Sequence, residues 1–471
     1  MRLQFFGAAR EVTGSKHLIT TEKGTKILLD CGLFQGIQTH ELNQEFGFDP
    51  KDIDCVILSH AHIDHSGLLP RLVKKGFQGP IYTTGATASL CHIMLLDSAY
   101  IQEKDVKLLN ERRIRQGRPT LELLYSVQDA EQALSMFKTI PYNMPVQINN
   151  GEVEFMLTDA GHLLGSAAVH LNIENGGEYV RLTFTGDIGR PGDNILRSPE
   201  PFPQADYIIC ESTYGDRLHP KEHDVLSHLE RIVFETCVSK RGKLIIPAFA
   251  VDRTQELIYA LDRLSSSGRL ARIPVYIDSP LAVEATKVMK RNDEYFNPEI
   301  LDYIEKDGDA FAFPNLRYIS DVAESKALNG KSEPCIIISA SGMAEAGRIK
   351  HHLLNNLESE RNTVLIVGYC SPHTLGAAIR NGESVVRIFG QDVKVAADVE
   401  ILDSFSGHAD YREMLDYLSC QDPEKVKKIF LVHGEFEKQI AFKHRLLDKG
   451  FKDIRIPLMK EWVILPVTTT S

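Results

Sequence analysis

Three histidines and one aspartate stand within six residues of the segment SHAHIDH (59–65). Imidazole nitrogens and carboxylate oxygens are ligands of first-row metals, and zinc accepts both. Side chains two residues apart on an extended segment point the same way, so His60 and His62 can hold one ion. The chain then bends into a predicted helix (SGLLPRLVKK), which lets Asp64 and His65 face a second ion. A hydrogen-bonded surface histidine is the usual explanation for one such residue, but it does not account for four together.

Two ions need more ligands, and these are expected where other strands end. His162 ends VEFMLTDAGH, Asp187 ends LTFTGD and His433 ends KIFLVHG. A carboxylate can bridge two ions, which favours Asp187 as a bridging ligand. Asp30, at the end of KILLD, suits a position behind a ligand, because metal-bound imidazoles usually donate their other N–H to a carboxylate or carbonyl. Taken alone, each of these residues is equally well explained as a loop or turn residue.

Short β-rich runs position these side chains in the first part of the chain. Strands are predicted within KILLDCG (26–32), DCVILSH (54–60), VEFMLTDAGH (153–162) and YVRLTFTGD (179–187), and each leads into histidine or aspartate. Helices are predicted over 86–105 and 128–138.

From about residue 206 the pattern changes to alternating strands and helices. The predicted strands are DYIICES, KLIIPAF (243–249), IPVYID (273–278), CIIISA (335–340) and TVLIVGY (363–369), with helices near 222–239, 252–265, from about 281 and near 345–357. Such alternation indicates parallel βαβ units. Short strands return after about 385, followed by a helix near 410–418. We therefore predict an α/β (α+β) protein whose β-rich sandwich, residues 1–205 and 386–471, is interrupted by an α/β domain over 206–385.

Composition places the chain among soluble globular proteins with two or three folding units. Of its 471 residues 43% are hydrophobic and 25% charged. No apolar run approaches the roughly 20 residues of a membrane-spanning helix, and the first residues turn polar too quickly for a secretory signal, so we expect a cytoplasmic protein without membrane contact. The eight cysteines lie mostly in apolar stretches without CxxC spacing, which predicts reduced thiols. The net charge of −11 argues against indiscriminate coating of nucleic acid but not against a local basic groove.

The runs LLDCG, SHAHIDHSG, DAGHLLGS and FTGDIG resemble the metallo-β-lactamase superfamily, whose HxHxDH pattern marks an αββα sandwich hydrolase. The resemblance implies two Zn²⁺ per chain. Two such ions, about 3.5–4 Å apart, lower the pKa of a bridging water and stabilise the charge of an in-line displacement. The implied ligands are His60, His62 and His162 for one zinc, Asp64, His65 and His433 for the other, and Asp187 between them.

Motifs further along the chain resemble the β-CASP group, RNA-processing nucleases that include ribonuclease J and the endonuclease subunit of the pre-mRNA 3′-end cleavage complex. These motifs are CESTYGDR (210–217), IPAFAVDRTQELIYAL (246–261), SASGM (339–343), SFSGHAD (404–410) and LVHGE (431–435). The resemblance implies that His408 protonates the departing alkoxide, that Glu211 keeps His408 oriented and protonated, and that Asp64 belongs to the catalytic set. Apart from the resemblance, His408 also suits a turn at a helix N-terminus.

Substrate phosphate must be held as well, and SASGM lies between a predicted strand and a predicted helix, where backbone N–H groups suit an anion. The candidates are Ser341, Gly342, Arg348 and Ser406. An ordinary glycine turn with a solvated arginine explains the same residues equally well. GYCSPHTLGAAI (368–379) departs from the group's GYQAxGTLGR pattern, because it lacks the arginine after the glycine.

The leading hypothesis is a zinc-dependent ribonuclease that cleaves single-stranded RNA in a channel between the two domains by two-metal hydroxide attack. Single-stranded DNA stays open as a substrate, and so does a homodimer. A small-molecule metallo-hydrolase would not need Glu211 and His408. A non-catalytic β-CASP scaffold subunit would be expected to have broken metal motifs, whereas every motif position is filled here.

Overall fold

The computed structural model describes residues 1–36, 39–219, 224–368, 370–371, 373–402 and 406–466. The chain divides into two compact units: a sandwich unit, Met1–Leu218 with Gly407–Ser471, and an inserted unit, His219–Ser406. Among the described helices, none is long and apolar enough to cross a membrane.

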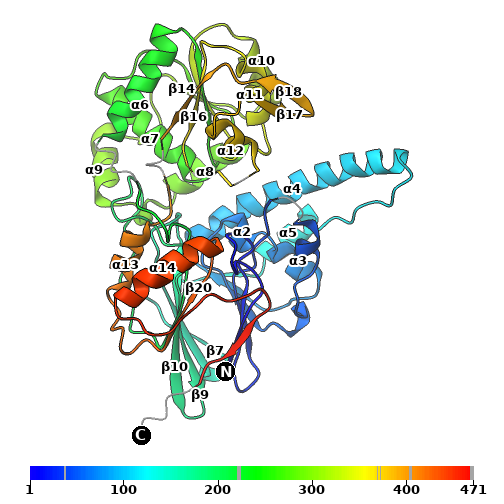
Figure 1. The fold of residues 1–471 in the computed structure, drawn as a ribbon, viewed down its shortest axis with the longest axis vertical. Coiled ribbons are helices and arrows are strands. Elements are labelled where there is room, and N and C mark those ends of the chain that lie inside the picture. Colours follow the sequence, from blue (N-terminus) through cyan, green and yellow to red (C-terminus); the bar gives the residue numbers. More distant parts are fainter. Residues whose placement is uncertain (37–38, 220–223, 369, 372, 403–405, 467–471) are drawn as a thin grey trace. The chain divides into compact units, whose positions relative to one another are not determined.

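Two seven-stranded sheets pack face to face in the sandwich unit (Figure 1). The first sheet has the order β22 (Trp462–Ile464), β1 (Arg2–Phe5), β2 (His17–Thr20), β3 (Lys26–Leu29), β4 (Cys55–Ile57), β5 (Ile81–Thr83) and β6 (Phe137–Thr139). The second has the order β21 (Ile454–Arg455), β20 (Lys428–Leu431), β11 (Tyr207–Cys210), β10 (Glu178–Phe184), β9 (Ala167–Asn175), β8 (Val153–Asp159) and β7 (Val146–Ile148).

Alternating side chains of both sheets form the core between them. Leu3, Phe5 and Ile57 of the first sheet pack with Phe155 and Phe184 of the second, and all are buried. Helices cover the outer faces: α1 (His40–Gln44), α2 (Ile63–Ser66), α3 (Leu69–Lys74), α4 (Gly85–Arg115) and α5 (Val127–Leu134) come from the first part of the chain, and α13 (Tyr411–Leu418) and α14 (Phe436–Asp448) pack on the second sheet. The predicted αββα sandwich is confirmed.

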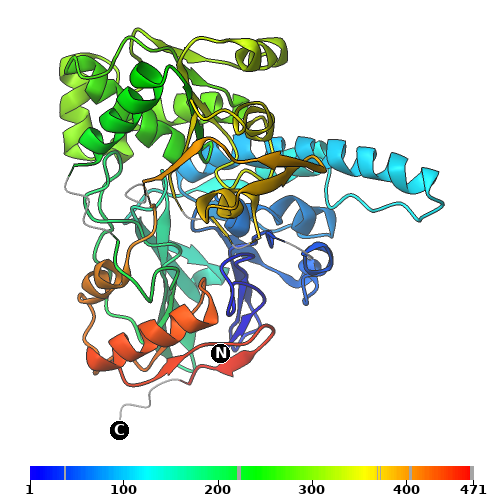
Figure 2. The same ribbon diagram turned by 45° about the horizontal axis from the view of Figure 1, so that its top comes forward.

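The inserted unit is built on a six-stranded sheet whose strand pairs are all parallel. Its order is β14 (Leu316–Tyr318), β13 (Val275–Ile277), β15 (Cys335–Ser339), β12 (Lys243–Pro247), β16 (Thr363–Ile366) and β19 (Asp398–Ile401), with a hairpin of β17 (Val385–Ile388) and β18 (Gln391–Lys394). The helices are α6 (Val225–Val233), α7 (Arg253–Ser266), α8 (Pro280–Lys290), α9 (Pro298–Asp307), α10 (Val322–Gly330), α11 (Ile349–Asn356) and α12 (Leu375–Arg380), visible from two directions in Figures 1 and 2. The predicted parallel α/β architecture is confirmed.

The contacts place the division between the units after Leu218 and after Ser406, later than the predicted boundaries after 205 and after 385. Strand β11, predicted to open the α/β series, pairs in parallel with β10 and β20 of the sandwich. Strand β19, predicted to belong to the resumed sandwich, pairs in parallel with β16. Strand β11 is an apolar run like its neighbours in either sheet, and β19 is a four-residue strand that alternates charged and apolar side chains. Neither local pattern reveals which sheet the strand joins.

Candidate metal centre and catalytic pair

Loops at one edge of the sandwich carry the predicted site residues. Strands β3 and β4 are parallel, and so are β10, β11 and β20, while β8 runs parallel to β10 because both are antiparallel to β9. Their carboxyl ends therefore meet at one edge of each sheet. The loops that follow carry Asp30, His60, His162, Asp187, Glu211 and His433, in that chain order.

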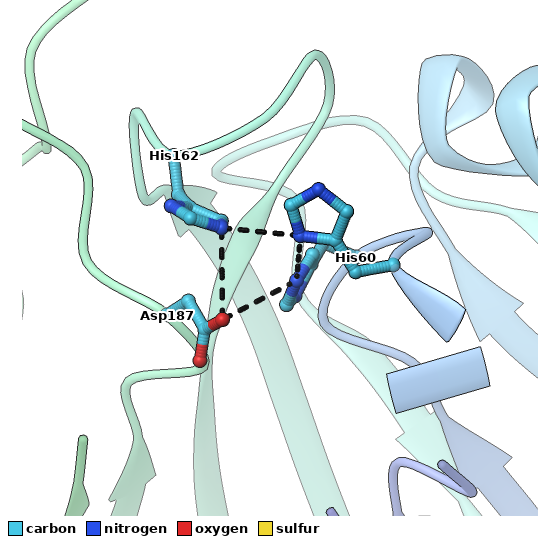
Figure 3. Close-up of side chains that lie close together, drawn as sticks. His60, His162 and Asp187 are labelled. Atoms are coloured by element: carbon cyan, nitrogen blue, oxygen red, sulfur yellow. Dashed lines mark hydrogen bonds and ion pairs between the residues drawn. The ribbon is translucent and has the colours of Figure 1, made fainter. Parts of the chain in front are cut away.

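Three of these side chains, His60, His162 and Asp187, converge with His62 in a first cluster, and Figure 3 shows the three pointing toward one another. His60 Nε2 lies 3.1 Å from His62 Nδ1, and His162 Nε2 lies 3.2 Å from the same atom. Asp187 Oδ2 lies 3.5 Å from His60 Nε2 and 3.6 Å from His162 Nε2. The cluster therefore presents three imidazole nitrogens and one carboxylate oxygen to one point.

A second cluster lies beside the first and consists of Asp64, His65 and His433. His433 Nε2 is 3.5 Å from Asp64 Oδ2. Asp187 reaches this group too, with Oδ2 3.3 Å from His65 Nε2 and Oδ1 3.5 Å from His433 Nδ1. The Asp187 carboxylate thus lies close to imidazole nitrogens of both clusters.

Hydrogen bonds fix the imidazoles from behind. In four of the rings the Nδ1 atom has a partner 2.7–3.0 Å away. The pairs are His60 with Ser59 Oγ, His65 with Asp30 Oδ2, His162 with the Gly407 carbonyl, and His433 with Thr213 Oγ1. Each of these rings therefore turns its Nε2 atom toward the clusters. Partners of this kind orient metal-bound imidazoles and set their tautomers. Asp30 itself accepts from the Ser59 backbone N–H, at 2.8 Å.

The donor set fits zinc. His65 Nε2, His433 Nε2 and Asp187 Oδ1 are buried and, within the described residues, have no hydrogen-bond partner, although buried polar atoms almost always have one. Ligand bonds of about 2.0–2.1 Å place neighbouring atoms of a tetrahedral site about 3.3 Å apart. The four closest contacts of the first cluster, 3.1–3.6 Å, bracket that spacing.

The electrostatics of the first cluster also suit a cation. Burial and then the neighbouring His65 lower the pKa of His60 well below its usual value, and burial lowers the pKa of His62 to about 4. Neutral imidazole is the form that binds a metal. Burial alone would raise the pKa of Asp187, but His433, His65 and His60 hold it well below its usual range.

His408 and Glu211 form a separate pair at the rim of the clusters. His408 Nδ1 lies 3.2 Å from Glu211 Oε1 and 4.0 Å from Asp187 Oδ2. Glu211 is fully buried and accepts from the backbone N–H groups of Ile188 and Thr213, whereas the His408 side chain is 21% exposed. Burial opposes protonation, but Glu211, then Asp187 and Asp64, raise the pKa of His408 above its usual value. The arrangement favours the protonated form of an imidazole that is still accessible to solvent.

The predicted phosphate residues all belong to the inserted unit. The Arg348 guanidinium donates to Asp278 Oδ1 at 2.6 Å and to the Ser320 carbonyl at 2.6 Å, so its hydrogen bonds are committed locally. Ser341 Oγ contacts the Ala346 backbone, and Gly342 packs so closely on Phe249 that a Cβ would lie 2.8 Å from the ring. Ser406 is buried. Residues 404–405 of SFSGHAD and residues 369 and 372 of the 368–379 loop lie outside the described residues.

Two residues that contact the site were not predicted. Ser59 and Thr213 hold His60 and His433, yet their types are common in any loop. Ser59 directly precedes His60, and Thr213 lies two residues after Glu211. That position, within motifs that were identified by other residues, was the only signal in the sequence.

Three family models match the chain in succession: the metallo-beta-lactamase superfamily over residues 12–226, the Beta-Casp domain over 254–379, and the Zn-dependent metallo-hydrolase RNA specificity domain over 392–457. A protein named Ribonuclease TTHA0252 from Thermus thermophilus is 38% identical over 96% of this chain and 97% of its own length. Proteins named Transcription termination factor FttA are 31% identical in Methanocaldococcus jannaschii, over 94% of this chain and 68% of theirs, and 31% identical in Methanothermobacter thermautotrophicus, over 98% and 71%.

The chain therefore belongs to the β-CASP family within the metallo-β-lactamase superfamily, as the motifs predicted. It is a metal-dependent hydrolase.

Proposed function

We propose that this protein is a zinc-dependent ribonuclease that hydrolyses phosphodiester bonds of single-stranded RNA. The observation that carries the proposal is the His408–Glu211 pair, 3.2 Å apart, beside two clusters of metal-ligand type that share Asp187. The relative whose sequence is covered over 97% of its length is named a ribonuclease, which supports RNA as the substrate. The match to the RNA specificity domain supports the same substrate.

His60, His62 and His162 would hold one zinc, Asp64, His65 and His433 the other, and Asp187 would bridge them. Two zinc ions there would supply Lewis acidity that lowers the pKa of a water and neutralises phosphate charge. Asp30, Ser59 and Thr213 keep the imidazoles oriented.

His408 would then act as the general acid. Breaking the P–O bond leaves an alkoxide on the departing nucleotide, and an imidazolium can donate a proton to it. Glu211, held by two backbone N–H groups, keeps the proton on His408. The products would carry a 5′-phosphate and a 3′-hydroxyl. A small-molecule hydrolase would not need this pair, which favours the nuclease.

The test uses the purified chain with internally labelled RNA and single-stranded DNA of the same sequence, with zinc present or chelated. We expect zinc-dependent cleavage of RNA. His408→Ala should lower kcat by roughly 100- to 10,000-fold while the zinc content stays near two per chain. If the His408→Ala variant kept full activity, His408 would not be the general acid. Failure of the wild type to cleave either polymer would favour a small-molecule substrate or a scaffold role.

A further inference from the structure

Helix α4 extends well beyond the body of the sandwich unit. It spans 31 residues, Gly85–Arg115, ten more at its end than the sequence pattern predicted, and its buried residues stop at Ala99. Figures 1 and 2 both show its second half, together with the returning segment 116–126, projecting from the rest of that unit. At about 1.5 Å per residue, the part beyond Ala99 is about 24 Å long.

The projecting part carries a positive charge in an acidic protein. Residues 100–118 contain six basic and three acidic side chains, a net charge of +3, whereas the whole chain carries −11. Lys107, Arg112, Arg115 and Arg118 are exposed and, within the described residues, make no ion pair. Lys104 lies over the ring of Tyr100, 4.1 Å from its centre, and the tyrosine is 52% exposed. The same stretch thus carries exposed cations and one exposed aromatic ring, Tyr100, among exposed apolar side chains such as Leu108 and Ile114.

Other side chains of the helix hold the returning segment in place. Asn110 exchanges two hydrogen bonds with the Leu121 backbone, at 3.0 and 2.7 Å, and Arg113 Nε donates to the Pro119 carbonyl at 2.6 Å. Glu103 accepts from the Val127 backbone N–H at 2.9 Å. These contacts stabilise the projection as a defined arm, and they leave the basic strip on its free side.

The other end of the helix is anchored to the loop that carries His162. Thr84 Oγ1 and Thr87 Oγ1, in the cap and first turn of α4, donate to the Gly165 carbonyl at 2.6 and 2.8 Å. Gly165 lies in the loop that carries His162, and a Cβ there would collide with Thr84. The arm thus starts at the loop of a candidate zinc ligand and runs outward from it.

We infer that this basic arm, residues 100–118, binds the phosphates of single-stranded RNA outside the metal centre, an inference that rests on the proposed ribonuclease function and extends it. RNA fits better than other anionic partners for two reasons. The strip offers an aromatic ring for base stacking beside its cations, and it leads away from the site where the same polymer would be cut. Contact through phosphates makes the binding independent of sequence and sensitive to salt.

The experiment neutralises the arm with Lys107→Gln, Arg112→Gln, Arg115→Gln and Arg118→Gln in one chain. The matched control neutralises four exposed cations elsewhere, Lys23, Arg272, Lys287 and Lys306, and so gives the same net charge. Thermal melting checks that both variants fold. Cleavage is measured on RNAs of about 6 and about 40 nucleotides, and anisotropy measures binding of the long RNA across a salt series.

The arm variant should lose roughly tenfold or more in kcat/KM on the long RNA at low salt and change less than about twofold on the short one. Four lost phosphate contacts should flatten the slope of log binding constant against log salt by about 3. An arm variant equal to the control on long RNA would overturn the inference while leaving the ribonuclease intact. Equal losses of activity on the short and the long RNA would also overturn the inference. So would a parallel measurement in which the arm affects binding to phosphatidylserine vesicles but not to RNA.

If the arm affects RNA binding but the wild type cleaves no RNA, the inference about the arm would stand and the proposed ribonuclease function would be refuted.

Discussion

Each unit of this protein contains a buried cluster of histidine and aspartate at the carboxyl end of a parallel strand, but the two clusters differ in how their polar atoms are satisfied. In the inserted unit, Asp278 accepts from Arg348, His352 and Ser325 at 2.6, 2.6 and 2.5 Å. The other ring nitrogen of His352 lies 2.9 Å from Asn329 Oδ1. Every hydrogen-bonding atom named here has a partner within the chain.

In the sandwich unit, two ring nitrogens that face the clusters lack such partners. His65 Nε2 and His433 Nε2 are buried and have no hydrogen bond within the described part of the chain, although the opposite nitrogen of each ring is held. An unsatisfied buried polar atom costs about 1–3 kcal/mol, so several at one point indicate a site built for a ligand. The same residue types thus form a structural network in one unit and a candidate metal centre in the other.

Asp187→Asn gives the largest expected effect, because the Asp187 carboxylate lies close to imidazole nitrogens of both clusters. We expect kcat/KM to fall at least about 1,000-fold and zinc to be lost from the purified protein. Zinc should raise the melting temperature of the wild type but not of the variant. Asp278→Asn is the matched control and should keep both zinc and activity. If the Asp187 variant kept zinc and activity, the cluster around Asp187 would not differ in function from the cluster around Asp278.

Asp278→Asn should instead reduce stability. Its carboxylate is the acceptor for Arg348 and His352, and an amide oxygen leaves the guanidinium without its counter-charge. Breaking a mostly buried pair in this way should cost about 2–3 kcal/mol. Urea unfolding of the zinc-loaded variant, with the inserted unit followed separately by hydrogen exchange, would measure this. If the variant unfolds like the wild type but hydrolyses RNA poorly, Arg348 has a role in the reaction after all.

Glu211→Gln should have an intermediate effect. Burial opposes protonation of His408, and Glu211 is the first group that raises its pKa. Because the protonated imidazole is the proposed acid, removing the carboxylate should move the alkaline limb of the kcat profile to lower pH. The loss should be roughly tenfold at pH 8 and smaller at pH 6. A uniform loss at all pH values would point to misplaced Ile188 and Thr213 loops instead, since both backbone N–H groups bind Glu211.

The sequence predicted the sandwich, the parallel inserted sheet and the set of residues that the structure brings together. His60, His162, Asp187 and His433 were found because each follows a predicted strand, and strand ends are where a sheet collects side chains from distant parts of the chain. The family motifs then linked Glu211 to His408, which stand 197 residues apart in the chain.

Three features could not be predicted from the sequence: the sheets that two strands join, the partner of Arg348 and the length of helix α4. Strands β11 and β19 join sheets that their local pattern cannot specify, and Arg348 is bound by Asp278, which no motif had selected. The second half of α4 has no buried face, and its apolar side chains, among them Leu108, Leu109 and Ile114, are exposed between charged ones, so the pattern of a packed helix stops before the helix does. The strand pairings and the Arg348 contact depend on residues far away in the chain. The end of α4 depends on the helix propensity of its residues and not on the burial of an apolar face.

Asp262 sharpens the comparison between the buried clusters of the two units. Among the residues that the structure describes, its buried carboxylate has neither a hydrogen-bond partner nor converging histidines. Burial, and then repulsion from Asp307, raise its pKa to about 7. An acid whose pKa is higher in the folded state is protonated there while the unfolded chain is already ionised, so stability falls as pH rises from about 4 to 7. Asp262→Asn removes this loss. Discounted for solvent screening, the variant should gain about 1 kcal/mol over the wild type at pH 8 and nothing at pH 4, measured by urea unfolding. A gain that is equal at both pH values would mean that Asp262 is already ionised in the folded protein, and that a lone unsatisfied carboxylate is tolerated without a ligand.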